Sequence, residues 1–205
     1  MQATVLIPAF NEEKTVAEVV KVAREAGFPV IVADDASQDA TAQRAEAAGA
    51  LVVRLSKNRG KGGAVAEGLK RVETPYLLLL DADLIGLRPE HLHALLKPVQ
   101  AGEARMSVGV FRKGRASTDW AMRITPFLSG QRALETEALR RMGGLELARY
   151  DLELLLTKHA KRAGWRGVYL PLEGGSQVMK GGKRGVLEGF AHRMRMYWEI
   201  LRALF

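Results

Sequence analysis

The 205-residue sequence contains no cysteine and no long apolar run. Without cysteine there are no disulfide bonds and no metal sites built on thiolates. A membrane-spanning helix needs about 20 consecutive apolar residues, and no stretch of the chain approaches that length. The first residues also lack the basic and then apolar layout of a secretory signal peptide. These absences lead us to expect a cytoplasmic protein.

Aromatic residues are scarce, at 6% of the chain, whereas basic residues are in excess and give a formal net charge of +8. A positive charge favours an anionic partner: nucleic acid, anionic lipid or a phosphorylated small molecule. The alternative is a basic, solvated surface without a partner. Recognition of nucleic acid needs a stacking platform or a recognition helix among the basic residues. With so few aromatic residues, we expect no nucleic-acid partner.

Apolar runs alternate with helical patterns through the first half of the chain. The expected strands and helices, in strict alternation, are 3–7, 12–26, 29–33, 39–48, 50–54, 62–71, 76–80 and 89–101. Repeated strand–helix units imply an α/β fold with a mostly parallel sheet sandwiched by helices. Ligands of such sheets bind beyond the carboxyl ends of the strands.

The second half is less regular. We expect strands at 106–111 and 168–170 and helices at 135–142, 151–163 and 186–205. The last of these is a basic segment whose large apolar residues recur at three- and four-residue steps, as in an amphipathic helix. Because there is no repeat and no linker, residues 1–205 are expected to form one domain.

The most informative motif is an apolar run, Leu77 to Leu80, that ends abruptly in Asp81 and Asp83. Such a run is typical of a buried strand that emerges at the edge of a sheet. Two carboxylates at that place are unfavourable unless a cation neutralises them. A hard divalent metal that also holds a diphosphate would do so. The motif therefore indicates an enzyme that uses nucleotide sugars.

Polar residues also follow the first two expected strands. Asn11 comes after the first strand and is a natural N-cap for the helix that follows. Asp34 and Asp35 come after the second strand, and they exceed what capping needs because Ser37 or Asp39 can cap the next helix. A carboxylate at this place can accept a hydrogen bond from a base N–H or a ribose hydroxyl.

A glycine-rich segment, Gly60-Lys61-Gly62, opens the helix after the third expected strand. Glycine permits close approach of a ligand to the backbone, the N-terminus of a helix attracts anions, and Lys61 adds a positive charge. The spacing differs from that of the phosphate-binding loop of NTPases. We interpret the segment as a turn that contacts a diphosphate, with a purely structural turn as the alternative.

Four motifs therefore follow one another in order: Pro8-Ala9-Phe10-Asn11-Glu12, Asp34-Asp35-Ala36-Ser37, Gly60-Lys61-Gly62 and Asp81-Ala82-Asp83. Together they resemble the motifs of the family-2 glycosyltransferases of the GT-A fold, near the dolichyl-phosphate hexosyltransferases and the glucosyl-3-phosphoglycerate synthases. The resemblance is dense in the first half of the chain and thin in the second. It implies a nucleotide-binding half, residues 1–102, and an acceptor-side half, residues 103–205.

The resemblance implies a glycosyltransferase that moves a hexose from a nucleotide-diphosphate sugar, with a UDP-sugar favoured, in the presence of Mg²⁺ or Mn²⁺. Asp83 would bind the metal. Relatives often carry a further histidine ligand where this chain has Gln177, whose amide oxygen suits Mg²⁺ better than softer metals. The residues that would bind the nucleotide sugar are Pro8, Ala9, Phe10, Asn11, Glu12, Asp34, Asp35, Lys61, Asp81 and Ala82.

Two segments of the second half resemble the acceptor side of these enzymes. Ser129, Gly130 and Gln131 would contact the acceptor. Glu153 would act as a general base on an acceptor hydroxyl or orient the sugar. The alternative for Glu153 is an acid favoured by the dipole of a helix whose first turn it occupies.

Arg112 and Lys113 follow the strand at 106–111, where relatives hold the acceptor, and arginine suits bidentate recognition of phosphate. We therefore expect a phosphorylated acceptor, such as a polyprenyl phosphate or phosphoglycerate, although the resemblance also allows a plain hydroxyl acceptor. With a polyprenyl phosphate, the basic helix at 186–205 would lie at the inner face of the membrane. With phosphoglycerate, that helix would pack on its own domain or form a homodimer contact.

Two other functions compete with this interpretation. A sugar-1-phosphate nucleotidyltransferase needs Gly-x-Gly-Thr-Arg after the first strand, where this chain has Ala9-Phe10-Asn11-Glu12. A non-catalytic protein that binds nucleotide sugars stays open, because the histidine ligand is missing. His91 and His93 are expected on a surface helix, and we assign them no role.

Overall fold

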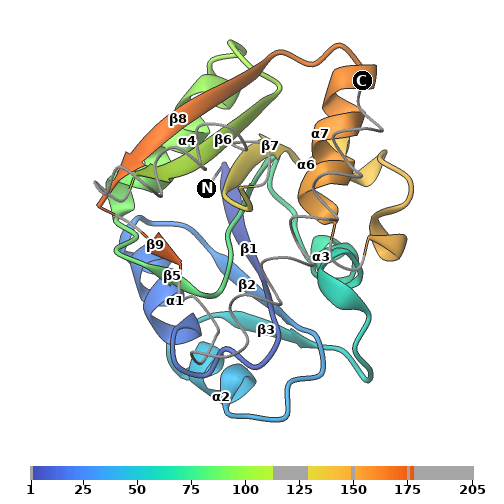
Figure 1. Ribbon diagram of the computed structural model, residues 1–205. Coiled ribbons are helices and arrows are strands. Elements are labelled where there is room, and N and C mark those ends of the chain that lie inside the picture. Colours follow the sequence, from blue (N-terminus) through green and yellow to red (C-terminus); the bar gives the residue numbers. More distant parts are fainter. Residues whose placement is uncertain (1, 113–128, 149–150, 175, 178–205) are drawn as a thin grey trace, which may run out of the picture.

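The computed structural model describes residues 2–112, 129–148, 151–174 and 176–177 (Figure 1). Seven strands form one sheet in the order β3-β2-β1-β4-β7-β6-β8, and β5 pairs with β9 in a second, two-stranded sheet. The strands are β1 (Ala3–Ala9), β2 (Val30–Asp34), β3 (Leu51–Arg54), β4 (Tyr76–Leu79), β5 (Leu84–Ile85), β6 (Met106–Arg112), β7 (Arg132–Glu135), β8 (Gly167–Glu173) and β9 (Ser176–Gln177).

All strands of the large sheet run in one direction except β7, which is antiparallel to both of its neighbours, β4 and β6. The helices are α1 (Val16–Glu25), α2 (Thr41–Ala47), α3 (Gly60–Leu69), α4 (Pro89–Gln100), α6 (Thr136–Arg140) and α7 (Leu152–Arg162), with a 3-10 turn, η2, at Leu145–Leu147. They lie on both sides of the sheet (Figure 1). The prediction of a mostly parallel sheet sandwiched by helices is confirmed.

The leucine run of β4 shows why the strand forms. Leu78 and Leu80 belong to the apolar core that α1 and α4 make with one face of the sheet. Leu77 and Leu79 belong to the core that α3, α6 and α7 make with the other face. Successive side chains of a strand point to opposite faces, so a strand between two cores must be apolar at every position.

The structure corrects the prediction that Asn11 caps the first helix. Helix α1 begins only at Val16, and no side-chain cap precedes it. Asn11 has a positive φ of 54°, its N–H donates to Ser37 Oγ, and its Oδ1 accepts from the N–H of Gln38, both at 2.9 Å. Asn11 therefore joins the loops after β1 and β2, a contact across 26 residues that local sequence patterns do not reveal.

His91 is also placed differently from the prediction, because it is buried, with 5% of its surface exposed. Its Nδ1 accepts a hydrogen bond from the N–H of Arg88 at 3.3 Å, which caps the start of α4. Its ring packs edge-on against Phe111, with 5.9 Å between the ring centroids. Burial, reinforced by the Arg88 charge, lowers the pKa of His91.

The expected helix at 186–205 lies outside the described residues, as does Lys113. In the described part of the chain, no helix has the length and apolar character needed to cross a membrane.

Candidate active site

Several polar side chains meet at the carboxyl edge of the parallel strands. Asp81 comes two residues after the end of β4. Because β7 is antiparallel, its first residue, Arg132, pairs with Leu79, the last residue of β4. The segment before β7 therefore reaches the same edge, and this places Ser129 to Gln131 beside Asp81.

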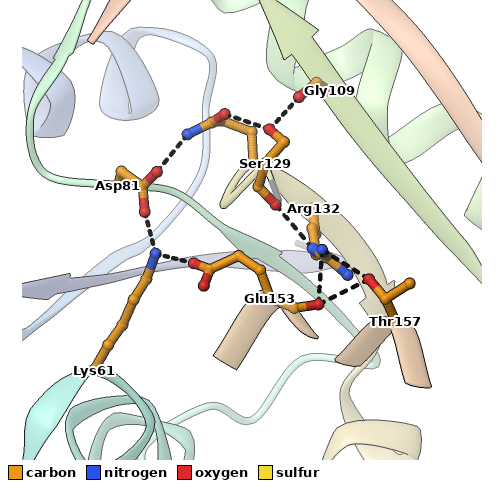
Figure 2. Close-up of polar contacts among 8 residues, drawn as sticks. Lys61, Asp81, Gly109, Ser129, Arg132, Glu153 and Thr157 are labelled. Atoms are coloured by element: carbon orange, nitrogen blue, oxygen red, sulfur yellow. Dashed lines mark hydrogen bonds and ion pairs between the residues drawn. The ribbon is translucent and has the colours of Figure 1, made fainter. Parts of the chain in front are cut away.

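Lys61 lies at the start of α3 and joins two carboxylates (Figure 2). Its Nζ donates to Asp81 Oδ1 and to Glu153 Oε1, so that one ammonium bridges α3, the end of β4 and the first turn of α7. The side chains are partly buried, with 28% of Lys61 and 14% of each acid exposed. Burial alone would lower the pKa of Lys61, but the two carboxylates outweigh it and raise that pKa above its ordinary value.

Gln131 and Gly130 hold the other side of the Asp81 carboxylate. Gln131 is buried, and its Nε2 donates to Asp81 Oδ2 at 2.8 Å. The hydroxyl of Ser129 lies between the carbonyl of Gly109 and Oε1 of Gln131 and can donate to either. Gly130 lies against the Asp81 carboxylate so closely that a Cβ would not fit. The three residues predicted to contact the acceptor therefore pack around Asp81.

Arg132 is a site residue that the sequence analysis does not single out. Its Nε donates to the carbonyl of Ser129 at 2.9 Å, and one terminal nitrogen donates to the carbonyl of Glu153 at 3.0 Å and to Thr157 Oγ1 at 3.1 Å. These contacts close a ring of polar residues around the site (Figure 2). We call this the polar ring; its members are Lys61, Asp81, Gln131, Ser129, Arg132 and Glu153. The available signal was a charged residue directly before two apolar ones at the start of a short strand, Arg132–Glu135.

Asp83 is half-buried and lies near further negative charge. Burial, together with the charges of Asp81 and Glu12, raises the pKa of Asp83 to about 6. Strand β9 pairs with β5 so that Gln177 is opposite Leu84, the residue after Asp83. The backbone thus brings Gln177, predicted as a metal ligand, next to Asp83.

A divalent metal fits the chemistry of these residues. Carboxylate oxygens are the ligands that Mg²⁺ prefers, and in phosphate-binding enzymes one or two carboxylates are enough because the phosphates and water supply the rest. Among the described residues, no group of three histidines or acids forms a complete set of metal ligands. Asp83, with Asp81 and Glu12 near it, therefore matches a metal shared with a bound diphosphate better than a closed structural site.

Asp35, predicted to bind base or ribose, has a structural contact that the sequence does not reveal. Its carboxylate accepts hydrogen bonds from the N–H groups of Arg59 and Gly60, at 2.7 and 2.8 Å. These N–H groups lie at the N-terminus of α3, where intrahelical partners are missing. Asp35 thereby caps a helix 24 residues further along the chain and fixes the position of Lys61, the second residue of that helix.

The two loops that follow β1 and β2 hold each other in place. The N–H of Glu12 donates to Thr41 Oγ1 at 2.7 Å, and the N–H of Glu13 donates to Asp39 Oδ2 at 3.2 Å. In return, Glu13 Oε2 accepts from the N–H of Ala40 at 3.2 Å. Asp34 is buried, and its Oδ1 accepts from the N–H of Ser37 at 3.2 Å. The segments predicted to bind the nucleotide therefore form one cross-linked surface.

The remaining predicted residues are more scattered. Pro8, Ala9 and Ala82 are buried, whereas Phe10 has 42% of its surface exposed beside Asn11. Arg112 ends β6 at the same edge of the sheet.

A mostly parallel α/β sheet with lysine and carboxylates at its carboxyl edge is typical of α/β enzymes, whose ligands bind beyond the carboxyl ends of the strands. The chain belongs to glycosyl transferase family 2, whose family model matches residues 4–188. It is a glycosyltransferase of the GT-A fold, as its motifs predicted.

Relatives of known sequence support this assignment. A glycosyltransferase of Mycobacterium tuberculosis (strain ATCC 25618 / H37Rv), itself described as uncharacterized, is 33% identical over an alignment of 219 positions that covers 97% of each chain. An undecaprenyl-phosphate 4-deoxy-4-formamido-L-arabinose transferase of Pseudomonas paraeruginosa is 28% identical over 129 residues, which cover 57% of this chain and 37% of that enzyme.

Solved structures show the same fold. Glucosyl-3-phosphoglycerate synthase from M. tuberculosis, in complex with Mn²⁺, UDP-glucose and phosphoglyceric acid, matches with a TM-score of 0.70 and 25% identity, over 88% of this chain and 72% of that chain. The same enzyme with Mg²⁺ and UDP matches with a TM-score of 0.71 and 25% identity, over the same shares of the two chains.

Proposed function

We propose that this glycosyltransferase moves a hexose from a UDP-sugar to a phosphorylated acceptor with the help of Mg²⁺ or Mn²⁺. The observation that carries the proposal is the position of Asp83, which lies beside the polar ring, near Asp81 and Glu12, at the carboxyl edge of the sheet. This is where ligands of parallel sheets bind.

The donor is assigned to the cross-linked loops after β1 and β2 and to the start of α3. Asn11, Glu12 and Asp35 would hold the base and the ribose, while Lys61 would lie near the diphosphate. The assignment is supported by the hydrogen bonds that fix these loops before any ligand arrives, because a preformed site loses less conformational entropy on binding. UDP is favoured because the matched synthase structures hold UDP or UDP-glucose.

The metal is assigned to Asp83, with Gln177 as the second candidate ligand. When bound, Mg²⁺ or Mn²⁺ would offset the negative charge that builds on the leaving diphosphate. Asp81 is already paired with Lys61 and Gln131, so we assign it to the ribose or sugar rather than to the metal.

Glu153 is assigned to the acceptor. Its carboxylate is held on the Lys61 ammonium, directly across from Asp81. If the acceptor attacks through a hydroxyl, as in phosphoglycerate, Glu153 would take the proton. If the acceptor attacks through a phosphate oxygen, as in a polyprenyl phosphate, the nucleophile is already an anion and Glu153 would only orient the sugar.

A phosphorylated acceptor is supported by Arg112 at the end of β6 and by the matched enzymes. One of them is crystallised with phosphoglyceric acid, and another is named for undecaprenyl phosphate. Contact of residues 186–205 with a membrane, or with a second copy of the chain, stays a prediction.

Thermal shift tests the donor and the metal together. We expect UDP-glucose with Mn²⁺ or Mg²⁺ to raise the melting temperature, and chelation by EDTA to remove the rise. GDP-mannose serves as the matched donor control. The variant Asp83→Asn should lose the metal-dependent rise while keeping its melting temperature without ligand. An undiminished rise in that variant would contradict the metal assignment, and a rise only with the GDP-sugar would contradict the donor.

Transfer of radioactive glucose tests the acceptor. The labelled UDP-sugar is offered 3-phosphoglycerate, a polyprenyl phosphate in detergent, or unphosphorylated glycerate. We expect product with a phosphorylated acceptor and none with glycerate. Equal transfer to glycerate would contradict the assignment of a phosphorylated acceptor.

A further inference from the structure

The guanidinium of Arg132 is completely buried at the start of β7, with 0% of the residue exposed. Moving such a charge out of water is costly, and an apolar side chain of similar volume often serves stability as well or better. A protein that keeps a cation here needs hydrogen bonds that an apolar side chain does not supply.

Those hydrogen bonds join two separate segments of the site (Figure 2). On one side, Arg132 Nε donates to the carbonyl of Ser129 at 2.9 Å. On the other side, a terminal nitrogen donates to the carbonyl of Glu153 at 3.0 Å and to Thr157 Oγ1 at 3.1 Å, while the Thr157 hydroxyl donates to the same carbonyl at 2.7 Å. The planar guanidinium thereby fastens the first turn of α7 to the segment before β7.

Each fastened segment carries one side chain that contacts the ion pair of Lys61 and Asp81. Gln131 holds Asp81 from the segment before β7, and Glu153 projects from α7 onto Lys61. The distance between Asp81 and Glu153 therefore depends on how firmly the two segments are joined. Misplacement of reacting groups by about 1 Å can lower a rate by about a hundredfold.

We propose that Arg132 is a positioning residue, which sets the separation of the sugar-side carboxylate, Asp81, from the acceptor-side carboxylate, Glu153. It acts through the backbone of Ser129 and Glu153 and touches neither substrate. The kinetic part of this inference rests on the proposed function, whereas its structural part does not.

Three variants separate the roles of charge, shape and partner. Arg132→Met fills similar space without donors, Arg132→Lys keeps the charge but lacks the planar fork, and Thr157→Val removes one acceptor while keeping the volume. Arg140→Met is the matched control, because Arg140 donates to a backbone carbonyl, that of Val72, outside the polar ring.

Hydrogen exchange of the protein without ligands tests the structural part. We expect Arg132→Met to speed exchange at least about tenfold in both residues 129–135 and residues 152–157, with α1 unchanged. Arg140→Met should leave both segments unchanged. Acceleration in only one segment, or equally throughout the chain, would overturn the inference. If Arg132→Met does not fold, Arg132→Lys and Thr157→Val supply the same comparison with smaller effects.

Steady-state kinetics tests the consequence for the reaction. We expect Arg132→Met to lower kcat or raise the acceptor KM by about tenfold or more, with the donor KM and the UDP-dependent thermal shift within about twofold. Arg132→Lys should recover part of the loss. Unchanged values of kcat and acceptor KM would overturn the inference. So would a fall in kcat/KM that is equal for donor and acceptor and matches the fall in the fraction of folded protein. If the wild type transfers no sugar, the proposed function fails, and hydrogen exchange still decides the role of Arg132.

Discussion

Gly130 lies in direct contact with the carboxylate of Asp81. A Cβ at Gly130 would lie within 3.0 Å of both carboxylate oxygens, which is closer than real Cβ atoms come. The backbone of Gly130 is not in the left-handed region, so glycine is needed here for space and not for conformation. The carboxylate is thus enclosed by Gly130, by the Lys61 ammonium and by the Gln131 amide.

Gly130→Ala should therefore displace Asp81. Because Asp81 is held on two sides, its carboxylate would give up one hydrogen bond, and we expect kcat/KM for the donor to fall by about tenfold or more. Gly143→Ala is the control, since a Cβ there meets nothing within 4 Å. Both variants should be compared in transfer assays and in thermal melts. Full activity of Gly130→Ala would show that the position of Asp81 is not critical.

Lys61→Met should leave two partly buried carboxylates without their shared cation. The free energy of unfolding should fall by roughly 1–3 kcal/mol, and transfer should fall by about tenfold or more. Lys70→Met, which removes an exposed ion pair to Glu67, is the control and should cost less than about 1 kcal/mol. Urea unfolding and transfer rates measure the two effects. A Lys61→Met protein as stable and as active as the control would contradict the bridging role.

Asp35→Ala should weaken the start of α3. The N–H groups of Arg59 and Gly60 would lose their acceptor, and the loss of a helix cap lowers stability by about 1–2 kcal/mol. Asp35→Asn keeps one amide oxygen and should lose less. The exposed acid Glu46, paired with Arg54 on the surface, provides the control variant Glu46→Ala. If Asp35→Ala and Glu46→Ala have equal stabilities in urea, the capping role is wrong.

His91 predicts a pH dependence of stability. Burial lowers its pKa below the ordinary value of 6.5, so the folded protein binds fewer protons than the unfolded chain just below that pH. Above pH 6.5 His91 is mostly neutral in the folded and the unfolded protein, and its contribution to the free energy of unfolding is complete. That contribution is lost as the pH falls through the lowered pKa. His91→Gln should make the free energy of unfolding less dependent on pH between about 5 and 7. The control is His93→Gln, at an exposed position of the same helix. Urea unfolding at several pH values measures the effect, and a free energy of unfolding that depends on pH in His91→Gln as in the wild type would contradict this account.

Sequence patterns predict the parallel part of the fold well, and the reason is local. The run Leu77 to Leu80 is apolar at every position, as is typical of a strand between two cores, and the structure distributes these leucines between two cores. Strand β7 is not predictable in this way. It is four residues long and begins with Arg132, whose charge is accommodated by carbonyl groups from elsewhere in the chain.

The residues of the candidate site also fall into those that local sequence indicates and those that it does not. Asp81 and Asp83 are predictable because charge ends an apolar run. The helix cap made by Asp35, the loop contact of Asn11 and the burial of His91 depend on partners distant in sequence. For His91 a signal existed, since it precedes Leu95 by four residues and so shares the apolar stripe of its helix.

Strand β7 runs against its neighbours, so the chain leaves β6 and returns into β7 at one and the same edge of the sheet. Everything between those strands therefore starts and finishes beside the polar ring. If β7 ran parallel to β4, it would begin at the opposite edge of the sheet, and Gln131 would lie the length of a strand away from Asp81. The reversal of a single strand therefore lets residues from both halves of the sequence close around one carboxylate.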